Sequence, residues 1–249
     1  MGHSIYREWV RTIRRAFRAP LPEHAAYQAL VRGKEGLEIG GPSELFRRVL
    51  PVYAAAKSVD GVNFSTSTIW EGRLTEGRTY AYMSGRTGWQ FIGEATKLSQ
   101  IAPQRYDFVL SSNCLEHIAN PLRAVEEWMR VLRPGGHMLL VLPRRESNFD
   151  HRRPVTAFSH LKDDFEQGVD EHDLTHLDEI LELHDYAMDP PAGDREAMRR
   201  RSLANFENRC LHHHVFDQDL IEAMFRHFGL EPLMQTTTAS DHIAVARKS

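Results

Sequence analysis

Short strand-like segments alternate with amphipathic or loop segments between residues 37 and 142. Segments of strand length occur at residues 37–39, 58–60, 90–92, 106–110 and 137–142. Before the last of these, apolar residues at positions 122, 125, 128, 129 and 132 have the spacing of an amphipathic helix, with Asn120 as its N-cap and Pro121 at its first position. Strands that alternate with helices predict a doubly wound α/β fold, a parallel sheet with helices on both faces.

Further elements extend this pattern on both sides. A helix is predicted over Ser43–Leu50, closed by Pro51, and residues 61–88 have no long periodic run, so we expect a loop with a small element there. At the other end, residues 217–228 predict a helix stopped by a glycine, followed by strands at 230–236 and 243–245.

Residues 144–214 do not follow the alternation. They come directly after the fifth predicted strand, where an open α/β sheet has its ligand crevice at the carboxyl ends of the strands. The segment is rich in histidine and acidic residues. We therefore expect it to be a cap insert over an active site, within a single domain of residues 1–249.

Residues 1–30 are predicted to form an N-terminal helical segment. Apolar residues at positions 5, 6, 9, 10, 13 and 17 recur at helical spacing among five arginines. A basic amphipathic helix can lie on a membrane surface, or it can pack on the domain and expose its arginines, and we favour the second.

Composition narrows the class of protein. The chain is 41% hydrophobic and 26% charged, typical of a globular protein. Its 31 basic residues against 34 acidic ones produce no global field that would attract nucleic acid. With two cysteines, no membrane-length apolar run and no signal-peptide core, we expect a cytoplasmic location without integral membrane association.

A strand that ends in a glycine turn, Leu37 to Ser43, is the first candidate ligand site. Glycines at positions 40 and 41 let the backbone approach a ligand closely, and free N–H groups of the helix near Ser43 favour an anionic group. Asp60 is predicted to end the second strand, where a carboxylate can accept hydrogen bonds from a ribose diol. Glu94 follows the third strand.

Together with the segments Asp107–His117 and Leu132–Gly136, this turn resembles the class I S-adenosylmethionine-dependent methyltransferases, with a type 11-like core. The resemblance covers residues 35–143 and 215–247, and it implies a seven-stranded Rossmann-like sheet with S-adenosyl-L-methionine as cofactor. The cofactor-binding residues that it implies are Glu38, Gly40, Gly41, Pro42, Ser43, Asp60, Glu94, Ala95 and Asn113. The chain departs from the family's glycine run at Pro42 and Glu44, which stand where the second and third glycines are usual.

A nicotinamide-binding Rossmann domain is the nearest alternative. It requires Gly-x-Gly-x-x-Gly at the turn, whereas residues 40–45 read Gly-Gly-Pro-Ser-Glu-Leu. The segments 115–117 and 132–136 also have no role in that alternative, and we place it second.

Three residues are candidates for catalysis. Methyl transfer from a sulfonium needs alignment of the reactants, and a base when the acceptor is a hydroxyl. His117 follows the fourth strand at the predicted crevice, while Asp150 and His151 come soon after the fifth. Because the insert is polar and poor in aromatic residues, we expect O-methylation of a small-molecule or sugar-containing acceptor, and no nucleic acid substrate.

The histidines of the insert leave further alternatives open. His172 and His176 have a spacing that can bind a metal, but Thr175 and Asp178 also resemble a helix start, and we favour the structural role. Residues 212–214, three histidines in a row, could reach the crevice or form a satisfied polar cluster. No spacing is specific enough to predict a metal. A cofactor-binding module without catalysis and a metal-assisted enzyme remain as alternatives, and the oligomeric state is not predicted.

Overall fold

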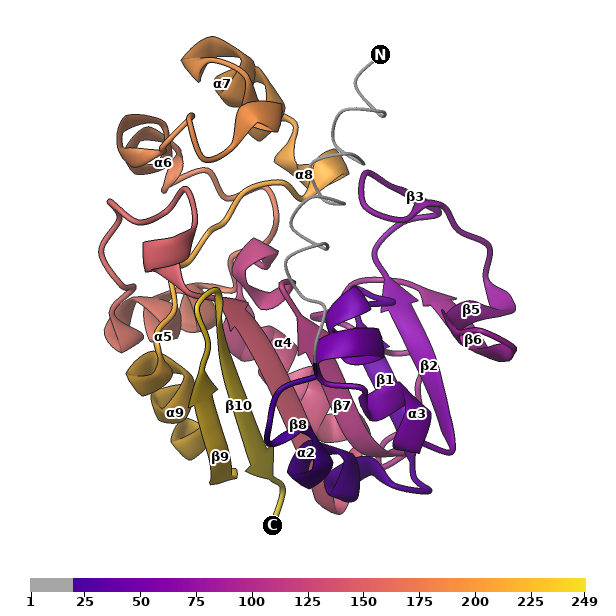
Figure 1. The fold of residues 1–249 in the computed structure, drawn as a ribbon. Coiled ribbons are helices and arrows are strands. Elements are labelled where there is room, and N and C mark those ends of the chain that lie inside the picture. The colour runs from indigo at the N-terminus through magenta and orange to yellow at the C-terminus, as the bar shows by residue number, and fades with distance from the viewer. Residues whose placement is uncertain (1–19) are drawn as a thin grey trace.

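In the computed structural model, which describes residues 20–249, an eight-stranded sheet forms the centre of the fold (Figure 1). The strands lie in the order β5-β6-β2-β1-β7-β8-β10-β9. Their bounds are β1 (Glu35–Ile39), β2 (Ser58–Asn63), β5 (Gly77–Met83), β6 (Arg86–Ile92), β7 (Tyr106–Ser112), β8 (Leu132–Pro143), β9 (Glu231–Thr237) and β10 (Asp241–Arg247). Five consecutive strands of the sheet, β6, β2, β1, β7 and β8, run parallel to one another. Strand β10 is antiparallel to both β8 and β9.

The Rossmann-like α/β fold is confirmed, with one strand more than the seven predicted. The additional strand is β5, which pairs antiparallel with β6 at the sheet edge. The prediction of a loop over residues 61–88 is therefore wrong in part, since this stretch also holds the two-stranded ribbon of β3 (Ser67–Thr68) and β4 (Gly72–Arg73). Tyr80 and Tyr82 alternate with exposed residues along β5 and are buried, and this two-residue period was the available signal.

Helices cover both faces of the sheet. One face packs against α2 (His24–Val31), the helical turn η1 (Leu45–Val49) and α3 (Val52–Ala55), and the other against α4 (Pro121–Val131), α5 (Phe158–Gln167) and α9 (Gln218–His227). Strand β7 shows why two cores form. Phe108 and Leu110 point into one of them and Val109 into the other, because successive side chains of a strand face opposite sides.

Two helix starts match their sequence signals, and a third does not. Asn120 accepts a hydrogen bond from the Arg123 amide at 3.0 Å, as predicted, and Asp217 caps α9 in the same way. The predicted helix over 43–50 is reduced to η1, a turn of π type. The amide of Ser43 is held by Glu38 and by the hydroxyl of Tyr53, outside any helix.

The insert rises above the carboxyl ends of the parallel strands (Figure 1). Besides α5, it contains η3 (Arg145–Ser147), α6 (Leu177–Leu183), η4 (Pro190–Ala192), α7 (Arg195–Leu203) and α8 (Asn205–Asn208). It has a small apolar core of its own, made by Leu177, Ile180, Leu181, Ala192, Met198 and Leu211. The buried face predicted for α6 is confirmed, but Thr175 is not its cap, since its hydroxyl donates to Asp173. The α5 helix instead packs on α4 and α9.

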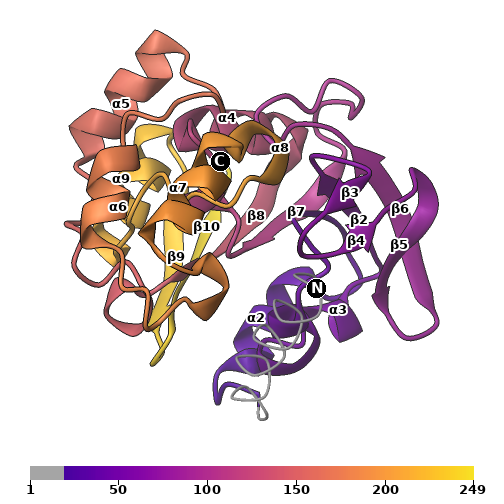
Figure 2. The same cartoon turned by 90° about the horizontal axis from the view of Figure 1, so that it is seen from above.

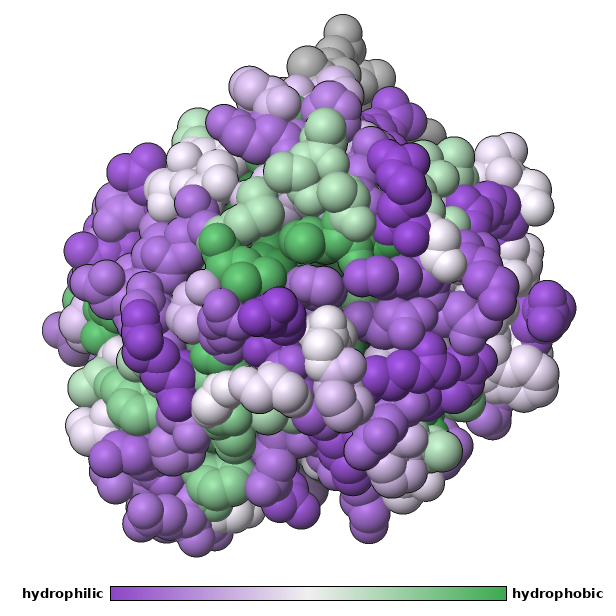
Figure 3. Space-filling model, turned by 90° about the horizontal axis from the view of Figure 1, so that it is seen from below, coloured by the Kyte–Doolittle hydropathy of each residue, from purple (hydrophilic) through white to green (hydrophobic). Residues whose placement is uncertain are grey.

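Seen from below, the end of the molecule remote from the insert is covered largely by hydrophilic residues, with one gathered hydrophobic patch (Figure 3). Among residues 20–249, no helix is long and apolar enough to cross a membrane. The apolar and basic pattern predicted as a helix within residues 5–17 lies outside the described residues.

Candidate active site

A cavity of about 410 Å³ lies at the carboxyl ends of the parallel strands. This is the size of a small-molecule site, in the position where open α/β sheets bind ligands. Its floor includes Ile39, Asn63 and Ser112 at the ends of β1, β2 and β7. The insert and the β3–β4 ribbon stand on opposite sides of these strand ends (Figure 2), and Phe149 and Trp70 line the cavity from those two sides.

The glycine turn after β1 forms one wall. Gly40 has a φ of +80°, and a Cβ there would lie 2.7 Å from Sγ of Cys114, so a larger residue would be strained and would clash. Gly40, Pro42 and Ser43 line the cavity, as expected of a ligand-binding turn. Gly41 lies behind them, where its carbonyl accepts from Nδ2 of Asn63 at 3.0 Å.

Glu38 is buried beneath the turn and is not among the residues that line the cavity. Its carboxylate accepts hydrogen bonds from the hydroxyls of Tyr53 and Tyr80 and from the Ser43 amide. Burial raises the pKa of Glu38 to about 7 although these hydrogen bonds lower it. Glu38 therefore fixes the shape of the turn. The Ser43 amide, predicted to face the ligand, donates to Glu38 instead.

Asp60 does not end its strand, contrary to prediction. Strand β2 continues to Asn63, and Asp60 pairs in register with Leu37, below the cavity. Its carboxylate accepts from the Trp89 amide and from the hydroxyl of Tyr106, each at 2.7 Å. The residue at the strand end, with a side chain facing the ligand space, is Asn63, so the strand boundary was the step that failed.

The other predicted cofactor residues line the cavity. Glu94 forms a two-pronged ion pair with Arg209 of the insert, at 2.8 and 2.9 Å, and the guanidinium also lies 4.9 Å from the ring centre of Phe64. Ala95 follows, and its carbonyl accepts from the indole of a buried tryptophan. Asn113 directly follows β7 and has a left-handed conformation, with a φ of +48°. This arrangement brings core and insert together on one side of the cavity.

A histidine–carboxylate pair lies on the side of the cavity formed by the insert, where His212 lines the cavity and the buried Asp150 lies behind it. Nδ1 of His212 donates to Asp150 at 2.5 Å, since an ionised carboxylate can only accept. Arg153 donates to the other oxygen of Asp150 at 3.0 Å. Burial would raise the pKa of Asp150, but His212 and Arg153 lower it to about 2. Burial lowers the pKa of His212, but Asp150 and Glu116 raise it above its ordinary value overall.

His117 lies beside this pair. Its Nδ1 donates to the carbonyl of Leu211 at 3.0 Å, and its ring centre is 4.5 Å from that of His212. Burial and the neighbouring His212 lower the pKa of His117 well below the ordinary value. Glu116 is buried, and its Oε2 has no hydrogen-bond partner. One ligand atom from each of Glu116, His117 and His212 lies within 4.8 Å of the others.

His151 is separated from the other catalytic candidates. Its side chain is one-third exposed, bonds Asp185 at 2.9 Å and does not line the cavity. Asp150, its neighbour in sequence, does reach the site through His212. The sequence left two roles open for residues 212–214, to reach the crevice or to form a satisfied polar cluster, and His212 does reach the cavity. Its pairing could not be predicted, because the partner lies 62 positions away and no local spacing reveals such a pair.

The cavity has the chemistry that S-adenosylmethionine requires. The cofactor carries a cationic sulfonium, and the carboxylates of Glu94, Glu116, Glu171 and Asp241 line the cavity. At Gly40 the turn presents backbone without a side chain to the cavity, which allows a ligand to approach closely. The residues present therefore fit this cofactor.

Comparisons with known proteins agree with this geometry. The model of a methyltransferase-domain family matches residues 1–235 of the chain. A comparison with curated proteins found no match. Among solved structures, the chain resembles a Thermotoga maritima protein described as a possible histamine N-methyltransferase, with 16% identity over 99% of this chain and 98% of that one and a TM-score of 0.52. It also resembles an S-adenosylmethionine-dependent methyltransferase of Aquifex aeolicus, with 10% identity over 96% and 98% of the two chains and a TM-score of 0.50.

Proposed function

Because the chain belongs to the class I S-adenosylmethionine-dependent methyltransferases, we propose that it methylates a hydroxyl group of a small or sugar-containing molecule, with His212 as general base. The observation that supports this proposal is that His212 lines the cavity and is held from behind by the buried carboxylate of Asp150. When bound, S-adenosylmethionine supplies an electrophilic methyl group and leaves as a neutral thioether.

The core of the fold would hold the cofactor. We assign this role to the turn at Gly40, to Asn63, to Glu94 with Ala95, and to Asn113, all of which line the cavity. In this proposal Glu38 supports the turn from below, through the tyrosine hydroxyls that it binds. Asp60 has no part in cofactor binding.

His212 would take the proton of the acceptor hydroxyl as the oxygen–methyl bond forms. Asp150 fixes Nδ1 of His212 as the protonated nitrogen, so that Nε2 carries the lone pair, and its negative charge stabilises the imidazolium that results. Positioned general bases of this kind contribute about 10²–10⁴-fold in rate. Phe149 and His117, whose rings lie 4.7 and 4.5 Å from that of His212, would position the acceptor.

The insert limits the acceptor to a small molecule. In this proposal residues 144–214 form a cap on a single domain of residues 1–249, and Arg209 closes the cavity beside Glu94. The acidic groups around the cavity make a nucleic acid acceptor unfavourable.

Cys114 and Cys210 are both free, which favours a reducing compartment such as the cytoplasm.

A metal-assisted form of the same reaction is the second candidate. Nδ1 of His117 and Nδ1 of His212 each donate to a fixed acceptor, which is the usual arrangement around metal-bound imidazoles. Both Nε2 atoms are then available near the unpartnered carboxylate oxygen of Glu116. Two imidazoles and one carboxylate suit a divalent metal that would orient and acidify a hydroxyl.

The test measures release of S-adenosylhomocysteine with a panel of hydroxylated acceptors, for the wild type and for His212→Asn. We expect the variant to bind S-adenosylmethionine normally and to lose at least about 100-fold in turnover. His151→Asn is the matched control and should keep full activity, because His151 lies outside the cavity. Full activity of His212→Asn would refute the assignment. Loss of wild-type activity in chelator, restored by Mg²⁺ or Mn²⁺, would favour the metal-assisted form.

A further inference from the structure

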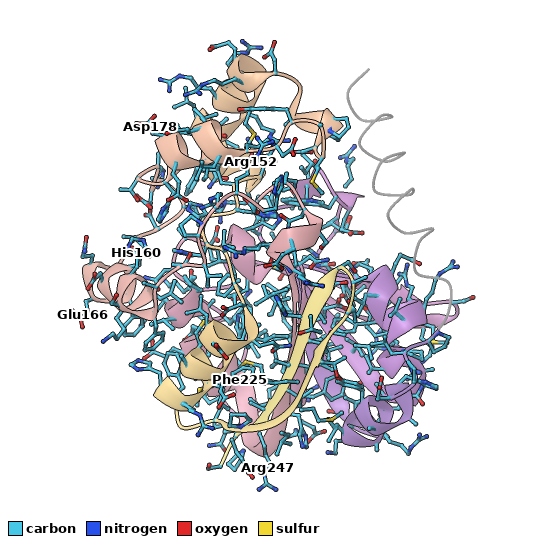
Figure 4. The ribbon with its side chains drawn as sticks, turned by 60° about the vertical axis from the view of Figure 1, so that its left-hand side comes forward. Arg152, His160, Glu166, Asp178, Phe225 and Arg247 are labelled. Atoms are coloured by element: carbon cyan, nitrogen blue, oxygen red, sulfur yellow. The ribbon has the colours of Figure 1, made fainter. Side chains whose placement is uncertain are left out.

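A second group of histidines lies in the insert, apart from the cavity. His160 and Asp164 stand one helical turn apart on α5, His176 precedes α6, and His214 lies in the segment that leads back to the core. None of the four lines the cavity. In Figure 4, His160 and Glu166 mark positions along α5, and Asp178 marks the start of α6 above them. The group thus joins three segments that are distant in sequence.

The donor atoms of these residues converge. Nε2 of His160 lies 2.9 Å from Nε2 of His176 and 3.4 Å from Oδ2 of Asp164. The same carboxylate oxygen lies 3.6 Å from Nε2 of His214. Ligand atoms on a tetrahedral zinc ion, each about 2.0–2.1 Å from the metal, are separated by about 3.3 Å. These three separations, between 2.9 and 3.6 Å, are close to this value, and all four ligand atoms lie within 4.8 Å of one another.

The group also contains a buried acceptor that the protein leaves unused. Asp164 is 6% exposed, and its Oδ2 has no hydrogen-bond partner among residues 20–249. Such an atom costs stability unless a cation or a donor satisfies it.

We propose that His160, Asp164, His176 and His214 form a binding site for a divalent transition metal, with zinc as the expected ion. Three imidazoles and one carboxylate are ligands that zinc accepts. His214 is the innermost ligand, and its Nε2, which contacts the carbonyl of Ala119 at 3.0 Å in the absence of metal, turns to the ion. His160, whose side chain is 38% exposed, lies on the route of entry.

The role of this metal is structural. Four protein ligands leave no open position for a substrate, which is typical of structural zinc sites. The α5 helix packs on α4 and α9 of the core, whereas His176 belongs to the segment that enters α6. The ion therefore fastens the outer part of the insert to the part that packs on the core.

Metal analysis of the untagged, full-length chain tests the proposal, with His160→Ala and Asp164→Asn as variants. His172→Ala is the matched control, since His172 lies in the same insert but is exposed and stacks on Phe206. We expect about one equivalent of zinc more in the wild type and in the control than in either variant. Asp164→Asn keeps the shape of the side chain, so a folded variant without metal separates ligation from folding.

Two further readouts make the result decisive. Adding Zn²⁺ to the chelator-treated chain should raise its melting temperature by at least about 5 °C, and this rise should disappear in both variants. Co²⁺ in place of zinc should give the visible absorption of a tetrahedral site in the wild type and in His172→Ala alone. Wild-type protein without bound zinc and without this thermal shift overturns the proposal. Zinc retained in His160→Ala and Asp164→Asn but lost in His117→Ala also overturns it, because the metal would then occupy the cavity.

Discussion

Replacement of Asp150 by asparagine removes the charge on which the base depends. The pKa of Asp150 is lowered to about 2 from an ordinary value of 3.8, and a shift of this size corresponds to about 2 kcal/mol in favour of the ionised carboxylate. Burial acts in the opposite direction, so the stabilisation comes from His212 and Arg153. The attraction is mutual: the same charge raises the pKa of His212, although burial lowers it.

The wild-type enzyme should therefore gain activity with rising pH, through an apparent pKa above 6.5, as His212 loses its proton. In Asp150→Asn the burial of His212 and the charge of Arg153, which both lower its pKa, remain, and the larger of the two opposing charges is gone, leaving only Glu116. The acidic limb of the profile should then move below pH 6.5. The plateau of kcat/KM should fall by about 10²–10⁴-fold, because Nδ1 is no longer fixed as the donor and the imidazolium loses its partner.

The assay is steady-state release of S-adenosylhomocysteine between about pH 5.5 and 9. Asp185→Asn makes the same substitution at the carboxylate that holds His151, outside the cavity, and should change neither limb nor plateau. An acidic limb at the same pH in wild type and Asp150→Asn would refute the coupling. A plateau that is unchanged in Asp150→Asn would refute the role of the pair in catalysis.

Three other substitutions test the site from different directions. Burial raises the pKa of Glu116 from 4.5 to about 7, so the wild type loses stability as the pH rises through this range. Glutamine cannot ionise, so Glu116→Gln should be more stable than the wild type by up to about 3 kcal/mol at pH 8 and equally stable at pH 4. Thermal unfolding at the two pH values measures this difference. For the cofactor, Asn63→Ala should weaken calorimetric binding of S-adenosylmethionine by about tenfold through loss of the bond to Gly41. Asp60→Asn should change the affinity for S-adenosylmethionine by less than about twofold. A larger loss of affinity in Asp60→Asn than in Asn63→Ala would indicate that Asp60 does bind the ribose.

The sequence pattern was sufficient for the order of the core elements. Strands that are buried on both faces, such as β7, read as continuous apolar runs, and the caps at Asn120 and Asp217 follow local hydrogen-bond rules. Strand β5 and the end of β2 were missed. In both cases a tertiary contact decides the outcome: the ring of Tyr80 packs where a Cβ of Gly61 would lie, and this contact joins β5 to β2.

The site was predictable where it depends on the backbone and not where it depends on pairing. The turn at Gly40 and the left-handed Asn113 follow from strand ends and short-range geometry. In contrast, His212 with Asp150 and Arg209 with Glu94 are pairs separated by 62 and 115 positions. The path of the insert brings each pair together, and a single sequence does not contain that path.

The consecutive histidines 212–214 show how one segment serves several roles. His212 faces Asp150 and the cavity, while Nε2 of His213 lies 3.0 Å from Nδ2 of Asn205 in α8. His214 reaches the group around Asp164. The segment is held to the core, because the amide of His213 donates to the carbonyl of Glu116 at 2.8 Å. A metal bound to His214 would therefore also restrain His212, the proposed base, which lies two residues away. The stability of the insert and the alignment of His212 are thus coupled through the same stretch of backbone.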